Sequence, residues 1–436
     1  MQETHKQIPR EGRFYAAILA FLAACYLAQI FTPLRLNDDA VTLLSEAESV
    51  AHNNGFLVQG QSTLYPPGYP ALVASLLRMG VAHSWVILTL NAGFLFLGLF
   101  ALRYVLTLAF FRDQRYILTI YAASLLSFVF IIFFTLPLTD VPFFCVAMCC
   151  LAAMEHTVRL RVGGRFWRWL LVAGILLLGS LAVRRVGLAL IPAFLWMVIS
   201  LPAVKTYRKG WSLRRAVFAI GSLAFLVVVV IGWTAANLNV SLRDFRSTVH
   251  GRTLAYTAWS IIGYRLTELG QIAANVPLHT LPEFAQHVLP WVGALFLTTV
   301  IAGLFLKRKT FGPTDAFAVG YLAILFAWPM SNPRLWLPMI PLLISYCTLA
   351  IAHVVARHHR VPAKLVAVYV AVYTVMGLDW LASSMMITFS SSAFLTMYVP
   401  QNQYAPTYCA VLGTCKSGFD PRAVDQNVAH LLRLYK

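Results

Sequence analysis

The sequence predicts an all-α integral membrane protein, a polytopic bundle of about eleven transmembrane helices. Two observations point to this class. First, 59% of the 436 residues are hydrophobic and only 11% are charged, with a mean hydropathy of +0.72. A soluble chain of this length could not bury that much apolar surface. Second, the apolar residues fall into segments of about 20 residues, the length that crosses a bilayer.

The expected spans follow one another along the chain with two long interruptions. We place them at Phe14–Thr32, Ser84–Phe111, Tyr116–Leu136, Val141–Val158, Trp169–Val183, Val186–Pro202, Ala216–Ala235, Pro290–Leu306, Asp315–Met330, Leu335–Ala356 and Lys364–Leu381. Together they form a transmembrane module over residues 1–382, with a first long loop at 33–83 and a second at 236–289. Residues 383–436 are expected to form a short polar tail outside the membrane.

The first long loop has internal structure. Apolar residues recur at helical spacing from Ala40 to Ala51, which predicts an amphipathic helix at the membrane surface. Asn53-Asn54-Gly55 should end this helix, because Asn and Gly accept the left-handed conformation. Tyr65-Pro-Pro-Gly-Tyr-Pro70 then predicts a stiff turn that leads into a short apolar helix.

The basic residues indicate the orientation. The formal net charge is +18, and most Lys and Arg residues lie in short loops between spans, so the positive-inside rule explains them better than nucleic-acid binding does. With the spans above, these loops all fall on one side. That side should be the cytoplasm and should hold the N-terminus. The first apolar run lacks a cleavage site and predicts a retained helix. We expect a multi-pass protein of the bacterial cytoplasmic (inner) membrane.

A small set of ionisable residues is left for the outer side. Its members are Asp38, Asp39, Asp140, Arg184, Arg185 and Arg334. All lie at the ends of expected spans, where a charge usually has a partner or a task because burying it costs roughly 2.5–3.5 kcal/mol. We therefore expect them to line one cavity that faces outward.

These residue types suit transfer from a phosphate-linked donor. Arginine matches phosphate oxygens with a fixed fork of donors and can stabilise a phosphate leaving group. An aspartate can take the proton of an attacking hydroxyl. The sequence contains no glycine-rich phosphate loop, which disfavours a nucleotide donor.

The same segments resemble the GT-C glycosyltransferases, multi-spanning enzymes that use polyprenyl-phosphate sugars. Asn37-Asp-Asp-Ala40 and Tyr65–Pro70 are similar to the first loop of the protein mannosyltransferase, aminoarabinose transferase and arabinofuranosyltransferase-like group. Thr139-Asp-Val-Pro142, Arg184-Arg-Val-Gly187 and Pro333-Arg-Leu-Trp-Leu-Pro338 resemble three later motifs of that group.

The resemblance implies a role for each motif. It implies an inverting transferase with Asp38 or Asp39 as base, and Arg184 or Arg185 together with Arg334 at the donor phosphate. Asp140 would be a second acidic motif, and Tyr65, Pro66, Pro67 and Tyr69 a substrate loop. The donor would be a polyprenyl-phosphate sugar and the acceptor a glycan, lipid or protein; the sugar and the acceptor stay open. Many relatives have a large soluble C-terminal domain, whereas this chain has only the tail.

Structural explanations compete with these roles. One of Asp38 and Asp39 could cap the following helix while the other acts as base. Asp140 could cap a span or pair with an arginine, and Tyr65–Pro70 could be only a rigid turn. The histidines show no metal-ligand spacing, so the sequence predicts no protein metal site; a divalent ion held by Asp39, Asp140 and the donor phosphate is left open. Cys409 and Cys415 could pair if the tail faces an oxidising compartment.

Two other functional classes are also left open. A transporter or lipid flippase would place its polar residues near the bilayer midplane on broken helices, often in repeats. A polysaccharide ligase or polymerase would concentrate them in a late outer loop. Convergence of the six charged residues on one cavity would favour the glycosyltransferase.

Overall fold

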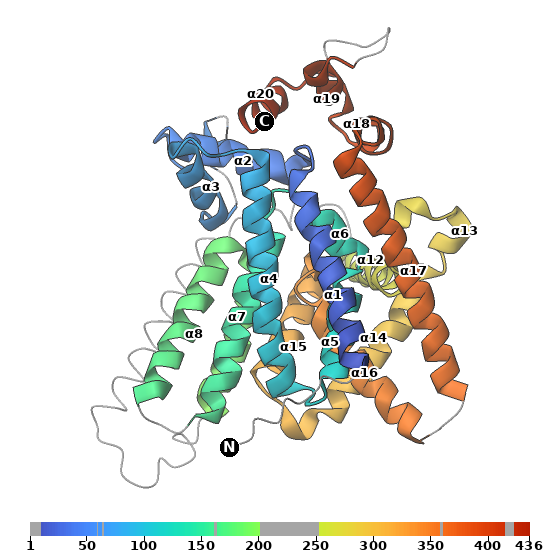
Figure 1. Ribbon diagram of the computed structural model, residues 1–436. Coiled ribbons are helices and arrows are strands. Elements are labelled where there is room, and N and C mark those ends of the chain that lie inside the picture. The colour runs from blue at the N-terminus through green and yellow to red at the C-terminus, as the bar shows by residue number, and fades with distance from the viewer. Residues whose placement is uncertain are drawn as a thin grey trace, which may run out of the picture.

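The computed structural model describes residues 10–58, 60–62, 65–160, 164–200, 253–357, 361–414 and 423–436. Long helices run side by side through most of this part of the chain (Figure 1). The helices that make up the bundle are α1 (Arg10–Ala28), α4 (Ser84–Ala109), α5 (Gln114–Leu125), α6 (Phe128–Phe134), α7 (Asp140–Arg159), α8 (Gly164–Val183), α9 (Leu190–Ser200), α12 (Leu254–Ala274), α14 (Leu289–Leu306), α15 (Pro313–Ala327), α16 (Ile340–Arg357) and α17 (Val361–Phe389). The chain is an all-α, multi-pass integral membrane protein.

The structure does not confirm the predicted number of spans. Within the described residues, 7 helices are long and apolar enough to cross a bilayer, or 8 if α5 and α6 form one bent span. The apolar helices at Arg185–Ser200 and Pro313–Ala327 fall short of that length. The predicted span Ala216–Ala235 lies outside the described residues. The predicted count of about eleven is therefore not confirmed.

The predicted span Tyr116–Leu136 is broken into α5 and α6, which meet at 57°. Asn275, in left-handed conformation at the end of α12, fills the break. Its amide donates to the Leu126 carbonyl at 2.9 Å, and its Oδ1 accepts from the Phe128 N–H at 2.8 Å. These two hydrogen bonds satisfy backbone groups that have no partner within the helix at the bend.

Two predicted polar regions are helical instead. The second long loop contains α12, which is 21 residues long. The last span continues to Phe389, so the predicted tail boundary at residue 383 falls inside α17. Ser384 and Thr388, two polar residues of the predicted tail, are buried and bind the Arg35 side chain.

The first long loop contains α2 (Asp38–Ala51), a two-stranded antiparallel hairpin of β1 (Leu57–Val58) and β2 (Gln61–Ser62), and α3 (Gly68–Arg78). Both predicted helices of this loop are confirmed. The helix α2 ends as expected, because Asn53 and Gly55 have φ values of 62° and 83°.

The segment after α17 folds back over the first loop. It carries α18 (Ser391–Ala393), α19 (Ala405–Leu412) and α20 (Gln426–Leu434), which lie at the same end of the bundle as α2 (Figure 1). Buried Tyr408, Leu431 and Tyr435 share one apolar cluster with residues of α2 and α3. Asn427 also donates to Ser45 at 2.9 Å. The tail is therefore part of the folded structure around the first loop.

Candidate active site

The acidic pair begins α2, but neither aspartate caps it. The N-cap is Asn37, whose side chain accepts from the Ala40 N–H at 2.9 Å. The interpretation in which one aspartate serves as the cap is therefore wrong. Asp38 and Asp39 occupy the first turn, where the helix dipole favours negative charge, and both side chains remain available for other partners.

Asp39 is held by two residues that are far away in sequence. The hydroxyl of Tyr65 donates to Asp39, and the guanidinium of Arg334 forms an ion pair with it. The side chains of Asp39 and Arg334 are 26% and 13% exposed. The structure thus brings together the predicted acidic motif, the first residue of the Tyr65–Pro70 turn and the late arginine motif.

A second pair lies beside the first. Asp140, in the first turn of α7, is paired with Arg184 at the end of α8, and their side chains are 1% and 12% exposed. Arg184 is also close enough to Asp39 and Tyr321 to interact with them electrostatically. Five of the six predicted outer charges therefore lie in one region: Asp38, Asp39, Asp140, Arg184 and Arg334.

Asp38 differs from its neighbour in its partners. Gln403 and Tyr404, in the segment before α19, both donate to Asp38 Oδ1, the Tyr404 hydroxyl at 2.5 Å. Burial, together with this hydrogen bond, raises the pKa of Tyr404 to about 12, so its hydroxyl stays protonated at neutral pH. Within the described residues Asp38 has no cationic partner, and its side chain is exposed.

Glu268 of α12 fixes the loop that carries Arg334. Its carboxylate accepts from the Ser331 hydroxyl at 2.8 Å, the Asn332 N–H at 2.6 Å and the Trp336 indole at 2.7 Å. Arg265, one turn earlier, neutralises Glu268 at 2.5 Å, and both side chains are fully buried. This network holds the 3-10 turn Pro333–Trp336 in place and with it Arg334.

Close backbone contacts explain the glycines of two motifs. A Cβ on Gly68 would lie 2.7 Å from the Ala182 carbonyl oxygen, and one on Gly187 would lie 2.9 Å from the Ser180 carbonyl oxygen. Real Cβ atoms do not approach other atoms so closely. Glycine therefore lets the Tyr65–Pro70 turn and the segment after Arg184 pack directly on the end of α8.

The remaining predicted site residues have other environments. Arg185 begins the 3-10 turn Arg185–Ala189 and is half-buried. Pro66 and Tyr69 are buried, and Pro67 is half-buried. The Tyr69 hydroxyl has no hydrogen-bond partner within the described part of the chain. Tyr65 is thus the residue of this loop that reaches the acidic pair.

Asp39 and Asp140, the candidate ligands of a divalent ion, are each neutralised by an arginine. No group of three or more His, Cys, Asp or Glu side chains within the described residues could hold a metal ion. This set of donors does not fit a resident divalent ion. Cys409 lies in α19, whereas Cys415 is outside the described residues, so their pairing stays a hypothesis.

Four residues of the site region are not among the sequence-predicted set. No local sequence pattern points to Gln403 and Tyr404, because they lie 365 and 366 residues from Asp38 in the chain. Arg265 and Glu268 could have been recognised from the sequence. They are opposite charges three residues apart in an apolar stretch that is compatible with a helix.

Arg35 is a further buried cation close to the acidic pair. It contacts the hydroxyls of Thr32, Thr135, Ser384 and Thr388 and lies 5.6 Å from the ring of Tyr398. Burial lowers its pKa to about 10, so it stays charged at neutral pH. The sequence could have pointed to Arg35, because it is a basic residue on the expected outer side and stands directly before the acidic motif.

The fold is that of known membrane glycosyltransferases. The structure superposes on ArnT, the aminoarabinose transferase of Cupriavidus metallidurans, in the apo state with a TM-score of 0.51, at 15% identity over 91% of this chain and 80% of that one. This chain has the GT-C fold. At 15% identity the similarity extends to the fold alone.

Two further solved structures are similar at lower scores. One is the same enzyme bound to undecaprenyl phosphate, with a TM-score of 0.48, 15% identity, and coverage of 89% of this chain and 80% of that one. The other is the oligosaccharyltransferase of Archaeoglobus fulgidus, with a TM-score of 0.46, 12% identity, and coverage of 94% and 58%. No protein-family model matches the sequence, and no curated protein matches it.

Proposed function

We propose that this protein is a membrane glycosyltransferase that moves a sugar from a polyprenyl-phosphate donor to a glycan, lipid or protein acceptor on the outer side of the membrane. The observation that carries this proposal is the meeting of two aspartate–arginine pairs, Asp39–Arg334 and Asp140–Arg184, beside the solvent-facing Asp38. The site combines cations for a phosphate with an open carboxylate for a hydroxyl.

The arginines are the donor-phosphate ligands in this proposal. A guanidinium has five N–H donors, and one carboxylate leaves most of them free. The Nε of Arg334 is buried without a hydrogen-bond partner in the described chain, which costs free energy unless a ligand satisfies it. A phosphate oxygen next to Arg334 and Arg184 would accept these bonds and share the positive charge.

Asp38 is the base. Asp39 and Asp140 are each bound by an arginine, so their oxygens are less available to an acceptor hydroxyl, which disfavours them for this role. Asp38 is bound by the neutral donors Gln403 and Tyr404, and its exposed side can receive an acceptor hydroxyl. These two side chains fix the carboxylate orientation without neutralising it.

The reaction is then one displacement. Asp38 takes the proton of the acceptor hydroxyl while that oxygen bonds to the anomeric carbon. The bond from this carbon to the phosphate oxygen breaks on the opposite face, which inverts the configuration. The bonding electrons leave with the phosphate, and Arg184 and Arg334 stabilise the added charge.

The position of the site suits a lipid donor. It lies at the ends of α7 and α8, both of which are long and apolar enough to cross a bilayer. A phosphate head group can reach the arginines there while its polyprenyl tail stays in the hydrocarbon region. ArnT, which shares the fold, has been solved with undecaprenyl phosphate.

Binding of undecaprenyl phosphate to the purified protein tests this proposal without knowledge of the sugar or the acceptor. We expect Arg334→Gln to weaken binding at least about tenfold, since a charge-assisted hydrogen bond contributes about 1.5–3 kcal/mol. Arg308→Gln, at the other end of the bundle, should bind as the wild type does. Equal binding by both variants, with unchanged melting temperatures, would contradict the assignment.

A further inference from the structure

A cavity of about 610 Å³ lies at the end of the bundle opposite to the candidate active site. We call it the basal cavity; its lining includes Phe110, Arg112, Glu155, Arg159, Trp196 and Lys307. The helix α7 connects the two places, because Asp140 begins it and Arg159 ends it. At about 1.5 Å per residue these residues are roughly 28 Å apart along the helix, so the cavity is separate from the active site.

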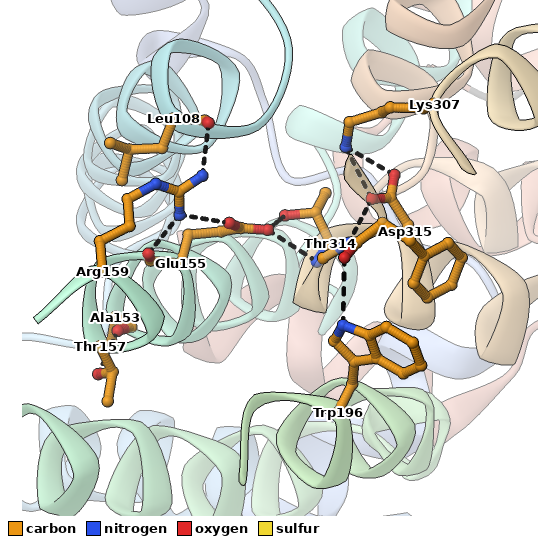
Figure 2. Close-up of polar contacts among 11 residues, drawn as sticks. Leu108, Ala153, Glu155, Thr157, Arg159, Trp196, Lys307, Thr314 and Asp315 are labelled. Carbon is orange, nitrogen blue, oxygen red and sulfur yellow. Dashed lines mark hydrogen bonds and ion pairs between the residues drawn. The ribbon is translucent and has the colours of Figure 1, made fainter. Parts of the chain in front are cut away.

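A network of polar contacts forms part of the wall of the basal cavity (Figure 2). Glu155 accepts from the N–H and the hydroxyl of Thr314 at 3.0 and 2.7 Å, which ties the end of α7 to the start of α15. Lys307 pairs with Asp315 at 2.7 Å, and the Tyr346 hydroxyl donates to the same carboxylate at 2.6 Å. The buried acids are thus already satisfied within the protein.

The two arginines that line the cavity, Arg112 and Arg159, have N–H groups without a partner in the described part of the chain. Arg159 pairs with Glu155 at 2.7 Å and donates to the Leu108 carbonyl at 2.6 Å (Figure 2). Its side chain is still 42% exposed, and two of its five N–H groups have no partner among the described residues. Arg112 is exposed and has no ion pair or hydrogen bond to any described residue. The cavity therefore presents net positive charge to a ligand.

The surroundings of the cavity are apolar. Phe110, Phe111 and Trp196 contribute aromatic walls. Exposed apolar side chains lie on the helices next to the cavity: Tyr104 of α4, Ile199 of α9 and Phe305 of α14 are 51%, 64% and 61% exposed. A ligand that fits has an anionic head and apolar chains that can follow these faces.

We propose that the basal cavity binds the phosphate head group of an anionic phospholipid from the adjacent leaflet. Arg112 and the free edge of Arg159 bind the phosphate, and the acyl chains lie along α4, α9 and α14. Basic pockets between transmembrane helices bind lipid head groups by this chemistry. The bound lipid would link the loop after α4, the end of α7 and the start of α15. The proposal is independent of glycosyl transfer.

The test uses the full-length protein, stripped of lipid in a neutral detergent and titrated with phosphatidylglycerol or with phosphatidylcholine of the same chain length. Lipid retention by native mass spectrometry and the melting temperature are the readouts. We expect the wild type to prefer phosphatidylglycerol. Arg112→Gln should weaken its binding about fivefold, the effect of one basic residue at a membrane surface.

Arg308→Gln is the matched control, because Arg308 lies on the neighbouring loop but does not line the cavity. It should keep the preference, as should the charge-conserving Arg112→Lys. Equal affinity of Arg112→Gln and Arg308→Gln for phosphatidylglycerol would overturn the proposal. So would complete displacement of the lipid by millimolar inorganic phosphate, since the cavity would then be a site for a free anion.

Discussion

Asp38 and Asp39 are adjacent in the chain, yet they contact different parts of the molecule. Asp38 is bound by neutral donors of the C-terminal segment, and Asp39 is bound by Tyr65 and Arg334. In the proposed function, Asp38 faces the acceptor and Asp39 belongs to the donor site. The same substitution should have different consequences at the two positions.

We expect Asp38→Asn to lower kcat of sugar transfer by at least about 100-fold, the usual contribution of a general base, with little change in donor affinity. Asp39→Asn should chiefly weaken donor binding, because Arg334 loses its charged partner. Release of polyprenyl phosphate from a sugar-loaded donor measures the first effect, and direct lipid binding the second. Normal turnover by Asp38→Asn would rule out its role as base.

The two tyrosines of the Tyr65–Pro70 turn form a matched pair. Tyr65→Phe removes the hydroxyl that donates to Asp39, whereas Tyr69→Phe removes a buried hydroxyl without a partner in the described chain. We expect the first change to reduce transfer about tenfold, as for a lost hydrogen bond to a charged group. The second should leave activity and melting temperature unchanged. Equal effects would mean that the turn acts only as a scaffold.

The charged residues of the site could be predicted because the chain is so apolar. Asp140, Arg184 and Arg334 stand out in tight loops at span ends, and the structure brings them to the acidic pair. The partners of Asp38 could not be predicted in this way. Gln403 and Tyr404 are ordinary residues in a polar segment, and their role depends on a fold-back that no local pattern encodes.

At the level of helices, α12 is the element that positions Arg334. Its Glu268 accepts hydrogen bonds from three residues of the Ser331–Trp336 segment. We expect Glu268→Gln to lower the free energy of unfolding by about 3–5 kcal/mol, because buried Arg265 is left without a counter-charge. Thermal unfolding in detergent measures this loss.

Glu283→Gln is the control for this substitution, since Glu283 is exposed on the short helix α13 (Glu283–Gln286). It should leave the melting temperature unchanged. A Glu268→Gln variant as stable as this control would show that the network around Arg334 contributes nothing to the fold.

Helix boundaries depended on tertiary contacts that the sequence pattern does not show. The break between α5 and α6 exists because Asn275, from a distant helix, satisfies the freed backbone groups. The last span continues beyond its predicted end at Leu381, and Arg35 donates hydrogen bonds to Ser384 and Thr388 in this added part. By contrast, α2 and α3 could be predicted, because their spacing, end signals and turn residues agree.

The molecule as a whole has a different group of charges at each end. Arg112, Arg159 and Lys307 come from three loops that the sequence assigns to the cytoplasm, and they meet at the basal cavity. The acidic pair and its arginines lie at the opposite ends of the same helices. The separation agrees with the orientation expected from the basic loops, which stays a prediction.

The tail should act as part of the site. Leu431 of α20 is buried in the apolar cluster that the tail shares with α2. We expect Leu431→Asp to detach the tail, because an unpaired buried carboxylate is costly, and so to remove Gln403 and Tyr404 from Asp38. Transfer should fall at least about tenfold, and the tail should become sensitive to protease.

Arg433→Gln, on the exposed side of the same helix, should change neither property. A Leu431→Asp variant with a protease-sensitive tail but full activity would show that the tail is dispensable for transfer.

The most direct test of the proposed function is a structure of the protein bound to undecaprenyl phosphate. We expect the phosphate within hydrogen-bond distance of Arg184 and Arg334, with Asp38 facing the opposite side of the space for the sugar. A phosphate bound at the basal cavity alone, or a water-filled path from Asp38 to the far face of the membrane, would contradict a glycosyltransferase and favour a transporter.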